Sequence, residues 1–407
     1  MKPEESGRQR IEWVASHMPV LGEIGKLFEK EKPFAGKKIA ASLHIEPKTA
    51  MLALTLKKGG AEVAICACNP LTTQDDTAAY LATQMKVYAR RGFSEQEQKE
   101  AFNKALDIKP DIFIDDGADL TALLHKERSD LSEKIKGGCE ETTTGVIRIK
   151  ALEKEGKLKF PMIAVNSGLM KHMFDNRYGT GQSVIDGIMT ATNLTIAGKN
   201  LVMVGYGWCG RGIAMRMKGL GARVTVTEID PIKALEAEMD GFYVMPLEEA
   251  AANADYIIAA TGSKNVVDEL HMKKMKNGCM LANAGHFNDE INIDALERLS
   301  SGKKEAKQYV TEYSLKDGRA LYLLGGGRLI NLVAGQGHPA EIMDLSFSLQ
   351  AMGARYVLVN SGKLSKKVYT VPDEIDAQVA QLCLKARGTR IDKITAEQEK
   401  YRNSWDI

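Results

Sequence analysis

The chain has no excess of charge of either sign. Its 407 residues carry 55 Lys and Arg against 53 Asp and Glu, a formal net charge of +2 at pH 7. Proteins that bind nucleic acid or acidic membrane surfaces usually carry a clear basic excess. We therefore expect neither partner and expect a small molecule instead.

The chain also lacks a long apolar run and a cysteine framework. No apolar segment reaches the length of a membrane span, and the first ten residues, MKPEESGRQR, are charged. These features predict a cytoplasmic protein without a leader peptide. The six cysteines are scattered, and Cys66 and Cys68 have no second pair or histidine at zinc spacing, so we expect free thiols and no metal site.

The most informative stretch is residues 200–230, which contains the parts of a dinucleotide-binding unit in order. Residues 201–204 predict a buried strand, and Gly205, Gly207 and Gly210 then form a GxGxxG pattern. Such glycines allow a tight turn, close approach of a pyrophosphate and close packing of helix on strand.

The residues after these glycines complete the unit. A predicted helix at 211–220 would direct its N-terminal N–H groups at phosphates. A second strand at 223–227 ends at Glu228, where an acid holds the ribose hydroxyls of NAD and repels the extra phosphate of NADP. The stretch therefore predicts NAD as the cofactor.

Strands and helices alternate before this unit, which predicts a parallel sheet covered by helices on both faces. Residues 1–10 are expected to fray and residues 11–29 to form a helix. The predicted strands are 38–43, 62–67, 111–115 and 161–165, and the predicted helices are 48–58, 74–85, 95–105 and 145–156.

Later segments predict a second α/β domain and a return to the first. A helix at 182–193 leads in, and a long helix from 340 to about 356 leads back. The predicted strands between them lie near 242–245, 255–260, 279–284, 308–313 and 320–324. The fold class is α/β with two doubly wound domains: a discontinuous substrate-binding domain (1–181 and 335–372), a Rossmann domain (182–334) and a helical tail for oligomerisation (373–407).

Ten sequence blocks together resemble the S-adenosylhomocysteine hydrolase family, in the short form of archaea and thermophilic bacteria. The blocks are LHIEPKTA (43–50), NPLTTQDD (69–76), IDDGADLT (114–121), EETTTGV (140–146), FDNRYGTGQS (174–183), AGKNLVMVGYGWCGRG (197–212), VTEIDP (226–231), NAGHF (283–287), GRLINL (327–332) and GHP (337–339). The resemblance implies a homotetramer in which the two domains close on each other.

The resemblance also implies the reaction, which is reversible hydrolysis of S-adenosyl-L-homocysteine to adenosine and L-homocysteine. NAD oxidises the ribose 3′-hydroxyl, the acidified 4′ C–H is removed, homocysteine leaves, water adds and the hydride returns. The catalytic positions carried over from the family are His44, Asp116, Glu141, Lys171, Asp175 and Asn176.

Other residues are carried over as ligands of substrate or cofactor. The expected substrate-binding residues are Glu46, Lys48, Thr49, Gln74, His286 and His338. The expected cofactor-binding residues are Thr142, Thr143, Thr144, Asn176, Gly205, Gly207, Gly210, Glu228 and Asn331. Among the catalytic positions carried over from the family, Lys171 and Asp175 would act on the 3′-hydroxyl. Asp115 and Asp119 are interpreted as caps or as groups that support the site residues without touching a ligand.

The roles of the remaining catalytic residues follow from the same resemblance. Glu141 would hold the ribose hydroxyls, while His44 and Asp116 would handle the 4′ proton and the 5′ carbon. The chain departs from the family at Thr180, where many members have a cysteine, and at Lys233, where an asparagine often contacts the cofactor ribose.

Lys48 is the departure that bears on substrate choice, because the family commonly has an acceptor there for the purine 6-amino group. Lysine has three donors and no acceptor. Facing the 6-oxo group of hypoxanthine, Lys48 would be matched, and S-inosyl-L-homocysteine would be the preferred substrate. The other interpretation is that Lys48 donates to the adenine ring or pairs with Glu46.

Two other function classes share part of the pattern. A net NAD-dependent dehydrogenase of the 2-hydroxyacid type would contain the same GxGxxG but would release NADH and would not explain the EETTTG block at 140–145. A non-catalytic homologue would have lost residues of the site, whereas the catalytic set carried over here is intact apart from the cysteine position.

Overall fold

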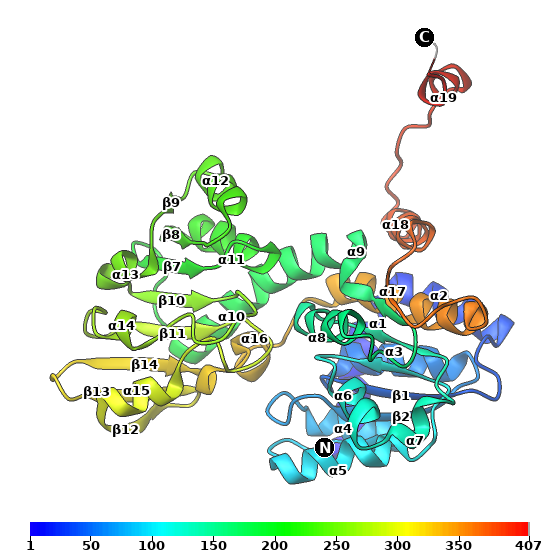
Figure 1. Ribbon diagram of the computed structural model, residues 1–407, viewed down its shortest axis with the longest axis horizontal. Helices are drawn as coiled ribbons and strands as arrows, with labels where there is room; N and C mark the ends of the chain where they lie inside the picture. The colour runs from blue at the N-terminus through cyan, green and yellow to red at the C-terminus, as the bar shows by residue number, and fades with distance from the viewer. Residues whose placement is uncertain (406–407) are drawn as a thin grey trace.

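The computed structural model describes residues 1–405, which form two α/β units lying side by side (Figure 1). The first unit has a sheet of seven parallel strands in the order β15-β6-β5-β4-β1-β2-β3. Its strands are β1 (Lys38–Leu43), β2 (Glu62–Ala67), β3 (Lys86–Tyr88), β4 (Ile112–Asp115), β5 (Gly137–Glu140), β6 (Met162–Ala164) and β15 (Val368–Thr370).

Helices cover both faces of this sheet, as the alternation of apolar runs predicts. One apolar core includes Phe28 and Leu52, and a second on the opposite face includes Phe113 and Phe160. The helices are α1 (Pro3–Ala15), α2 (Pro19–Glu31), α3 (Pro47–Lys58), α4 (Asp75–Ala82), α5 (Glu95–Leu106), α6 (Asp119–Lys126), α7 (Ser129–Ser132), α8 (Thr143–Lys154), α9 (Leu169–Lys171), α17 (Ala340–Asn360) and α18 (Asp373–Ala386), with a 3₁₀ turn at Val165–Ser167.

The second unit is a Rossmann-type sheet of eight strands in the order β12-β13-β14-β11-β10-β7-β8-β9. Strands β14 to β9 of this order are parallel, and β12 and β13 add an antiparallel extension. The strands are β7 (Asn200–Val204), β8 (Arg223–Thr227), β9 (Tyr243–Val244), β10 (Tyr256–Ala259), β11 (Met280–Asn283), β12 (Ser300–Lys307), β13 (Val310–Leu315) and β14 (Ala320–Leu324).

The helices of the second unit also lie over both faces of its sheet (Figure 1). They are α10 (Thr180–Thr192), α11 (Trp208–Gly219), α12 (Pro231–Met239), α13 (Leu247–Ala250), α14 (Glu269–Met272), α15 (Ile293–Leu299) and α16 (Ile330–Val333), with 3₁₀ turns at Ala251–Asn253 and Gly325–Gly327. Among residues 1–405, no helix has the length and apolar character that a membrane span requires.

Helix α10 joins the units and packs closely because glycines line its contacts. A Cβ on Gly181 would lie 2.6 Å from the Gly212 carbonyl oxygen of α11, and a Cβ on Gly187 would overlap the Ile330 carbonyl. Only residues without a side chain permit such approach of two backbones. The close packing fixes where the chain enters the second unit.

The prediction that residues 1–10 fray is wrong, because α1 begins at Pro3 and packs along α4. Ser6 Oγ donates to Asp76 at 2.9 Å, and Arg10 pairs with the same carboxylate at 3.1 Å. The predicted single helix over 11–29 is also wrong. The chain breaks before Pro19, whose ring is tolerated at the first turn of α2 and not in a helix interior.

The sequence pattern did not predict four short or polar strands, namely β3, β5, β12 and β15. The sequence of β5 is Gly-Gly-Cys-Glu, which has no apolar run. Its glycines are needed because a Cβ on Gly138 would lie 2.7 Å from the Phe113 ring. Strand β5 therefore exists because its neighbours β4 and β6 supply both the hydrogen bonds and the packing.

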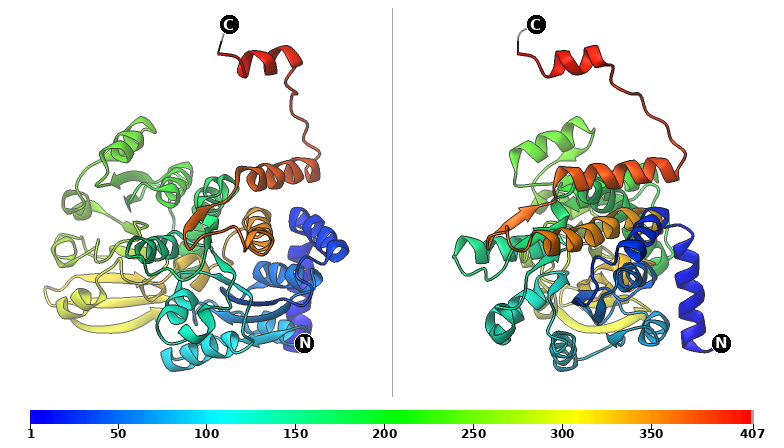
Figure 2. Two further views of the ribbon diagram at one scale, coloured as in Figure 1. Left: turned by 45° about the vertical axis from the view of Figure 1, so that its right-hand side comes forward. Right: turned by 90° about the vertical axis from the view of Figure 1, so that its right-hand side faces the viewer.

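The boundary expected at residue 372 falls too early, because α18 packs on α2 and α17 of its own chain. The Asp376 carboxylate of α18 accepts from the backbone N–H groups of Leu169 and Met170, at 2.7 and 2.9 Å. These are the first residues of α9, which lacks a cap of its own. Within the described residues, the segment 389–405, which contains α19 (Ala396–Arg402), stands away from the rest (Figure 2).

We predict that Asp376→Ala lowers the stability of the first unit, because it leaves the backbone N–H groups of Leu169 and Met170, at the start of α9, without their side-chain acceptor. Loss of a helix cap costs about 1 kcal/mol, which corresponds to a fall in the thermal midpoint of roughly 2–4 °C for a unit of this size. Calorimetry would measure it. Asp373→Ala, exposed in the same helix turn, is the matched control, and equal midpoints for the two variants would contradict the prediction.

Candidate functional site

A cleft of about 840 Å³, including its open mouth, is lined by residues of both units. Those from the first unit include residues that follow the carboxyl ends of β1, β4 and β5, where ligands bind in sheets of this kind. The predicted site residues that line the cleft are His44, Glu46, Lys48, Thr49, Asp116, Glu141, Thr142, Thr143, Lys171, Asp175, Asn176, His286, Asn331 and His338.

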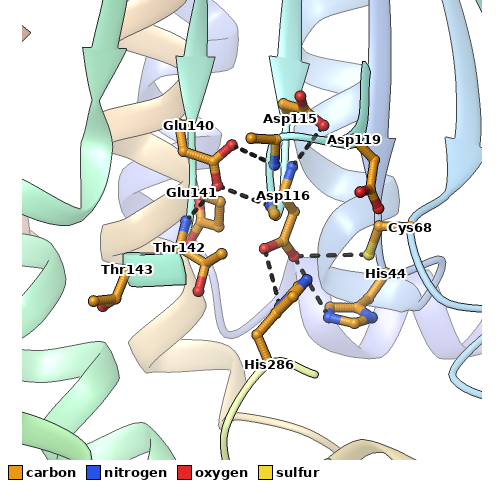
Figure 3. Close-up of polar contacts among 12 residues, drawn as sticks. His44, Cys68, Asp115, Asp116, Asp119, Glu140, Glu141, Thr142, Thr143 and His286 are labelled. Carbon is orange, nitrogen blue, oxygen red and sulfur yellow. Dashed lines mark hydrogen bonds and ion pairs between the residues drawn. The ribbon is translucent and has the colours of Figure 1, made fainter. Parts of the chain in front are cut away.

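One half of this cleft is organised around Asp116 (Figure 3). Its two carboxylate oxygens lie 3.4 Å from His44 Nε2 and 3.6 Å from His286 Nδ1, and the Cys68 thiol donates to it at 3.8 Å. On its other side, His44 Nδ1 lies 2.7 Å from Thr72 Oγ1. Asp116 thus joins a histidine of the first unit to a histidine of the second.

Burial determines the protonation state of His44. It lowers the pKa of the imidazole to about 4, although the nearby Asp116 charge favours the imidazolium. At neutral pH His44 is therefore uncharged, and one ring nitrogen is free to accept a proton.

Two further buried carboxylates shape the turn that carries Asp116. Asp115 accepts from the Thr121 backbone N–H and hydroxyl, each at 2.8 Å, which confirms its interpretation as a cap. Glu140 accepts from the N–H groups of Gly117 and Ala118, at 2.9 and 3.0 Å (Figure 3). Both carboxylates are occupied by backbone donors, so their role is to hold the loop.

The other half of the cleft is organised around the ammonium group of Lys171. Lys171 Nζ lies 3.1 Å from Asp175 Oδ1 and 3.4 Å from Glu141 Oε1, and it donates to Asn176 Oδ1 at 3.0 Å. Lys171 comes from α9, Asp175 and Asn176 come from the π-helical segment His172–Gly179 that follows it, and Glu141 lies between β5 and α8. Such π-helical turns are frequent at functional sites.

Each charge in this cluster alters the pKa of its neighbours. Burial alone would lower the pKa of Lys171, but Asp175 and Glu141 together outweigh burial and raise it. Burial raises the pKa of Glu141 to about 7 against the opposing charge of Lys171. For Asp175, burial is outweighed by Lys171 and His338, which hold its pKa well below its usual range. Glu141 is therefore the member that titrates near neutral pH.

Two residues of α17 support this cluster, and our sequence analysis did not identify them. Ser346 Oγ donates to Asp175 Oδ2 at 2.7 Å, and Gln350 Nε2 donates to Glu141 Oε2 at 2.5 Å. Both side chains are completely buried. The signal was present as two polar residues at i, i+4 spacing, which places them on one face of α17.

Lys48 is paired with Glu46, as one of the two interpretations of its sequence position states. Lys48 Nζ lies 2.7 Å from Glu46 Oε2 and donates to the Gln336 carbonyl at 2.9 Å. The Glu46 carboxylate also accepts from the Thr49 backbone N–H at the start of α3. Two of the three lysine donors are thus engaged within the protein.

His338 closes the cleft toward a neighbouring cavity. Its Nε2 lies 3.3 Å from Asp175 Oδ1 and 3.1 Å from Thr180 Oγ1, and its Nδ1 lies 3.4 Å from Asn331 Nδ2. Gln74 does not line the cleft. It lies in the neighbouring cavity together with Lys48 and His338.

A second cleft, of about 1390 Å³ with its mouth, adjoins the first and fits a dinucleotide. It is lined by Thr142, Thr143, Thr144 and Asn176 of the expected cofactor set, and by Gly207, which precedes α11. No side chain caps the N-terminus of α11. Its free N–H groups and helix dipole therefore fit a phosphate there.

The glycine loop beside this cleft has the geometry that the GxGxxG pattern predicts. Gly205 has φ +95°, which a residue with a side chain rarely adopts, and a Cβ on Gly210 would overlap the Gly205 carbonyl. Glu228 accepts from the backbone N–H groups of Tyr206 and Ile229, at 2.7 and 2.8 Å. The acid is held rigidly at the end of β8.

Residues 1–132 match the family model described as S-adenosyl-L-homocysteine hydrolase, and residues 176–337 match the one described as its NAD binding domain. The chain is similar to a protein named S-inosyl-L-homocysteine hydrolase from Methanocaldococcus jannaschii, with 57% identity over 402 residues, 98% of this chain and 97% of the relative.

Two further relatives carry a different name. Adenosylhomocysteinase from Pyrococcus abyssi is 57% identical over 400 residues, 98% of this chain and 95% of the relative. Adenosylhomocysteinase from Aquifex aeolicus is 55% identical over 405 residues, 99% of this chain and 97% of the relative. The similarity spans both units.

We predict that His44 stays neutral down to about pH 4, instead of titrating near 6.5. Between these values the unfolded chain binds more protons at this site than the folded one, so the folded state loses stability as pH falls through the window. Ring-nitrogen NMR would measure the titration, with His44→Gln to assign the signal. A midpoint near 6.5 would contradict the prediction.

Proposed function

The chain belongs to the S-adenosyl-L-homocysteine hydrolase family, and we propose that it catalyses reversible hydrolysis of S-adenosyl-L-homocysteine to adenosine and L-homocysteine with NAD. The observation that carries the proposal is that the Lys171 and Asp116 clusters share one buried cleft, which opens beside the cofactor cleft. Thr142, Thr143, Asn176 and His286 line both clefts. A ribose in the first cleft would therefore lie against the cofactor in the second.

The second cleft fits a dinucleotide, so the residues around it would bind and orient NAD. The residues that would hold it are the glycine loop, Glu228 and the threonines before and within α8. When bound, NAD would supply a reversible hydride acceptor for the ribose 3′ carbon, so that no net oxidation would result.

Lys171, Asp175 and Glu141 would act on the ribose hydroxyls. Lys171 enters as an ammonium, since two carboxylates raise its pKa. If Glu141, with a pKa of about 7, takes a proton when the ribose binds, one of these charges is removed. Burial would then lower the pKa of Lys171, so that the ammonium could release its proton to solvent and the resulting neutral amine could accept the 3′-hydroxyl proton.

His44 and Asp116 would act at the neighbouring carbons. A neutral imidazole can take the acidified 4′ proton or deliver it to the departing thiolate, and Asp116 holds the ring in place from 3.4 Å. His338, which lies between the cleft and the neighbouring cavity, would border the homocysteine tail.

Lys48 motivates a second candidate substrate, S-inosyl-L-homocysteine. The lysine has donors only, which match a 6-oxo purine better than a 6-amino purine, and one relative bears the corresponding name. Its pairing with Glu46 weakens this argument, because the pair is already satisfied without a base. Adenosine therefore remains the favoured nucleoside.

We predict that the NAD-loaded protein condenses homocysteine with adenosine without accumulating NADH. Thioether formation with adenosine and with inosine would be followed by chromatography, and cofactor reduction by absorbance. A rate with inosine at least tenfold higher would establish the second candidate. Steady NADH release would indicate a dehydrogenase.

We predict that Lys171→Met lowers kcat by roughly 10²–10⁴, while the exposed Lys154→Met leaves kcat unchanged. Equal rates for the two variants would contradict the role assigned to Lys171.

We propose that the protein works as a cytoplasmic homotetramer and that its tail docks on another copy. The segment beyond α18 stands away from its own chain (Figures 1 and 2) and carries exposed Ile391, Tyr401 and Trp405. Helix α12 exposes Ile232 and Met239 and provides an apolar surface that could receive it.

We predict that truncation after Gly388 reduces the assembly to smaller species while each chain stays folded, because residues 389–403 are all exposed and contribute no buried side chain to the core. Light scattering after size exclusion would give the mass, and circular dichroism the folding. An unchanged mass would refute docking by the tail.

A further inference from the structure

The loop after β11 extends from the second unit, which would bind NAD, to the first unit, and it carries His286 and Phe287. The buried side chain of Asn283 determines its shape. Asn283 Nδ2 donates to the Phe287 carbonyl at 2.6 Å and to the Gly327 carbonyl at 2.9 Å, and its Oδ1 accepts from Gly285 N–H at 2.8 Å. The backbone of the loop is therefore held at both ends by its own unit.

Arg148 reaches this loop from the first unit, where it lies on α8. Arg148 Nη1 donates to the Gly117 carbonyl at 2.9 Å and to Asp119 Oδ1 at 3.2 Å, both in the segment that follows Asp116. The guanidinium carbon lies 4.2 Å from the centre of the Phe287 ring, within the range of a cation–π contact. Arg148 thus contacts both units at once.

His286 lies between these two contacts. Its ring packs on Phe287 at 4.6 Å between centroids and 85° between planes. On its other side, a Cβ on Gly117 would lie 2.5 Å from His286 Nε2, so only a glycine leaves room for the ring. His286 Nδ1 then lies 3.6 Å from Asp116. The orientation of His286 depends on both Phe287 and Gly117, and Arg148 contacts each of them.

We propose that Arg148 is a positioning residue: its cation–π contact with Phe287 is a latch between the two units that holds His286 against Asp116. The kinetic part of this proposal rests on the proposed function. Within residues 1–405, the contacts of Arg148 are with Gly117, Asp119 and Phe287, and none of these residues belongs to the Lys171 cluster. Its effect is therefore exerted through His286 and the Gly117 turn.

The test compares Arg148→Met, Phe287→Leu and the double variant in the NAD-loaded protein. Arg148→Met should lower kcat/KM for the nucleoside by roughly tenfold, because it removes the ring contact and a charged hydrogen bond. Phe287→Leu, which keeps an apolar side chain, should lower it about threefold. The double variant should be no worse than Arg148→Met, since both remove the same contact.

A matched control comes from Arg90, whose guanidinium lies 5.2 Å from the Phe93 ring within the first unit. Arg90→Met should leave kcat/KM unchanged. Arg148→Lys should recover part of the loss, because an ammonium also binds an aromatic face. The latch would be overturned if the losses in kcat/KM of the two single variants added up in the double variant. It would also be overturned if Arg148→Met had no lower kcat/KM than Arg90→Met.

A second measurement does not depend on turnover. Hydrogen exchange of the amides of residues 284–288 should rise in Arg148→Met and Phe287→Leu and not in Arg90→Met. If the wild-type protein turns over neither nucleoside but the loop exchanges faster in these two variants, the latch stands and the proposed function falls. Unchanged exchange in both variants would refute the latch whatever the activity.

Discussion

The structure depends most on the buried ammonium of Lys171 and the two carboxylates around it. Lys171, Asp175 and Glu141 are only 5%, 4% and 6% exposed. A buried ion without a partner costs several kcal/mol, so every element that supplies a partner must be in place at once. The turn before α8, the π-helical segment and α17 all meet at this point, which links local folding to the chemistry of the site.

This requirement gives a physical reason for the discontinuous first unit. Ser346 and Gln350, which donate hydrogen bonds to the two carboxylates, lie on α17. In the chain, α17 comes only after the second unit is complete. Helix α18 then returns to cap α9 through Asp376. The segments that follow the second unit therefore support the Lys171 cluster, and the second unit is inserted between the two parts of the first.

The extent to which the sequence predicted the fold varied with the element. Strands β1, β2, β4 and β6 were predicted because central strands of a parallel sheet are buried on both faces and consist of apolar runs. Strand β5 was missed because two of its four residues are glycines, which leave room for the Pro161 carbonyl at Gly137 and for the Phe113 ring at Gly138. Helix α1 was expected to fray because its polar residues showed no sign of the partner, Asp76, that lies 70 positions after Ser6.

The sequence by itself determined the family, the NAD-binding pattern and most residues that line the cleft, because these follow from residue types at short spacing. Only the tertiary structure decided which charges meet, how their pKa values move and which residues support them. The neutral state of His44, the pairing of Lys48 with Glu46 and the contact of Arg148 with Phe287 depend on burial and on neighbours, several of them far apart in the chain. Electrostatic interactions act through space, and the spacing of residues along a chain does not reveal those distances.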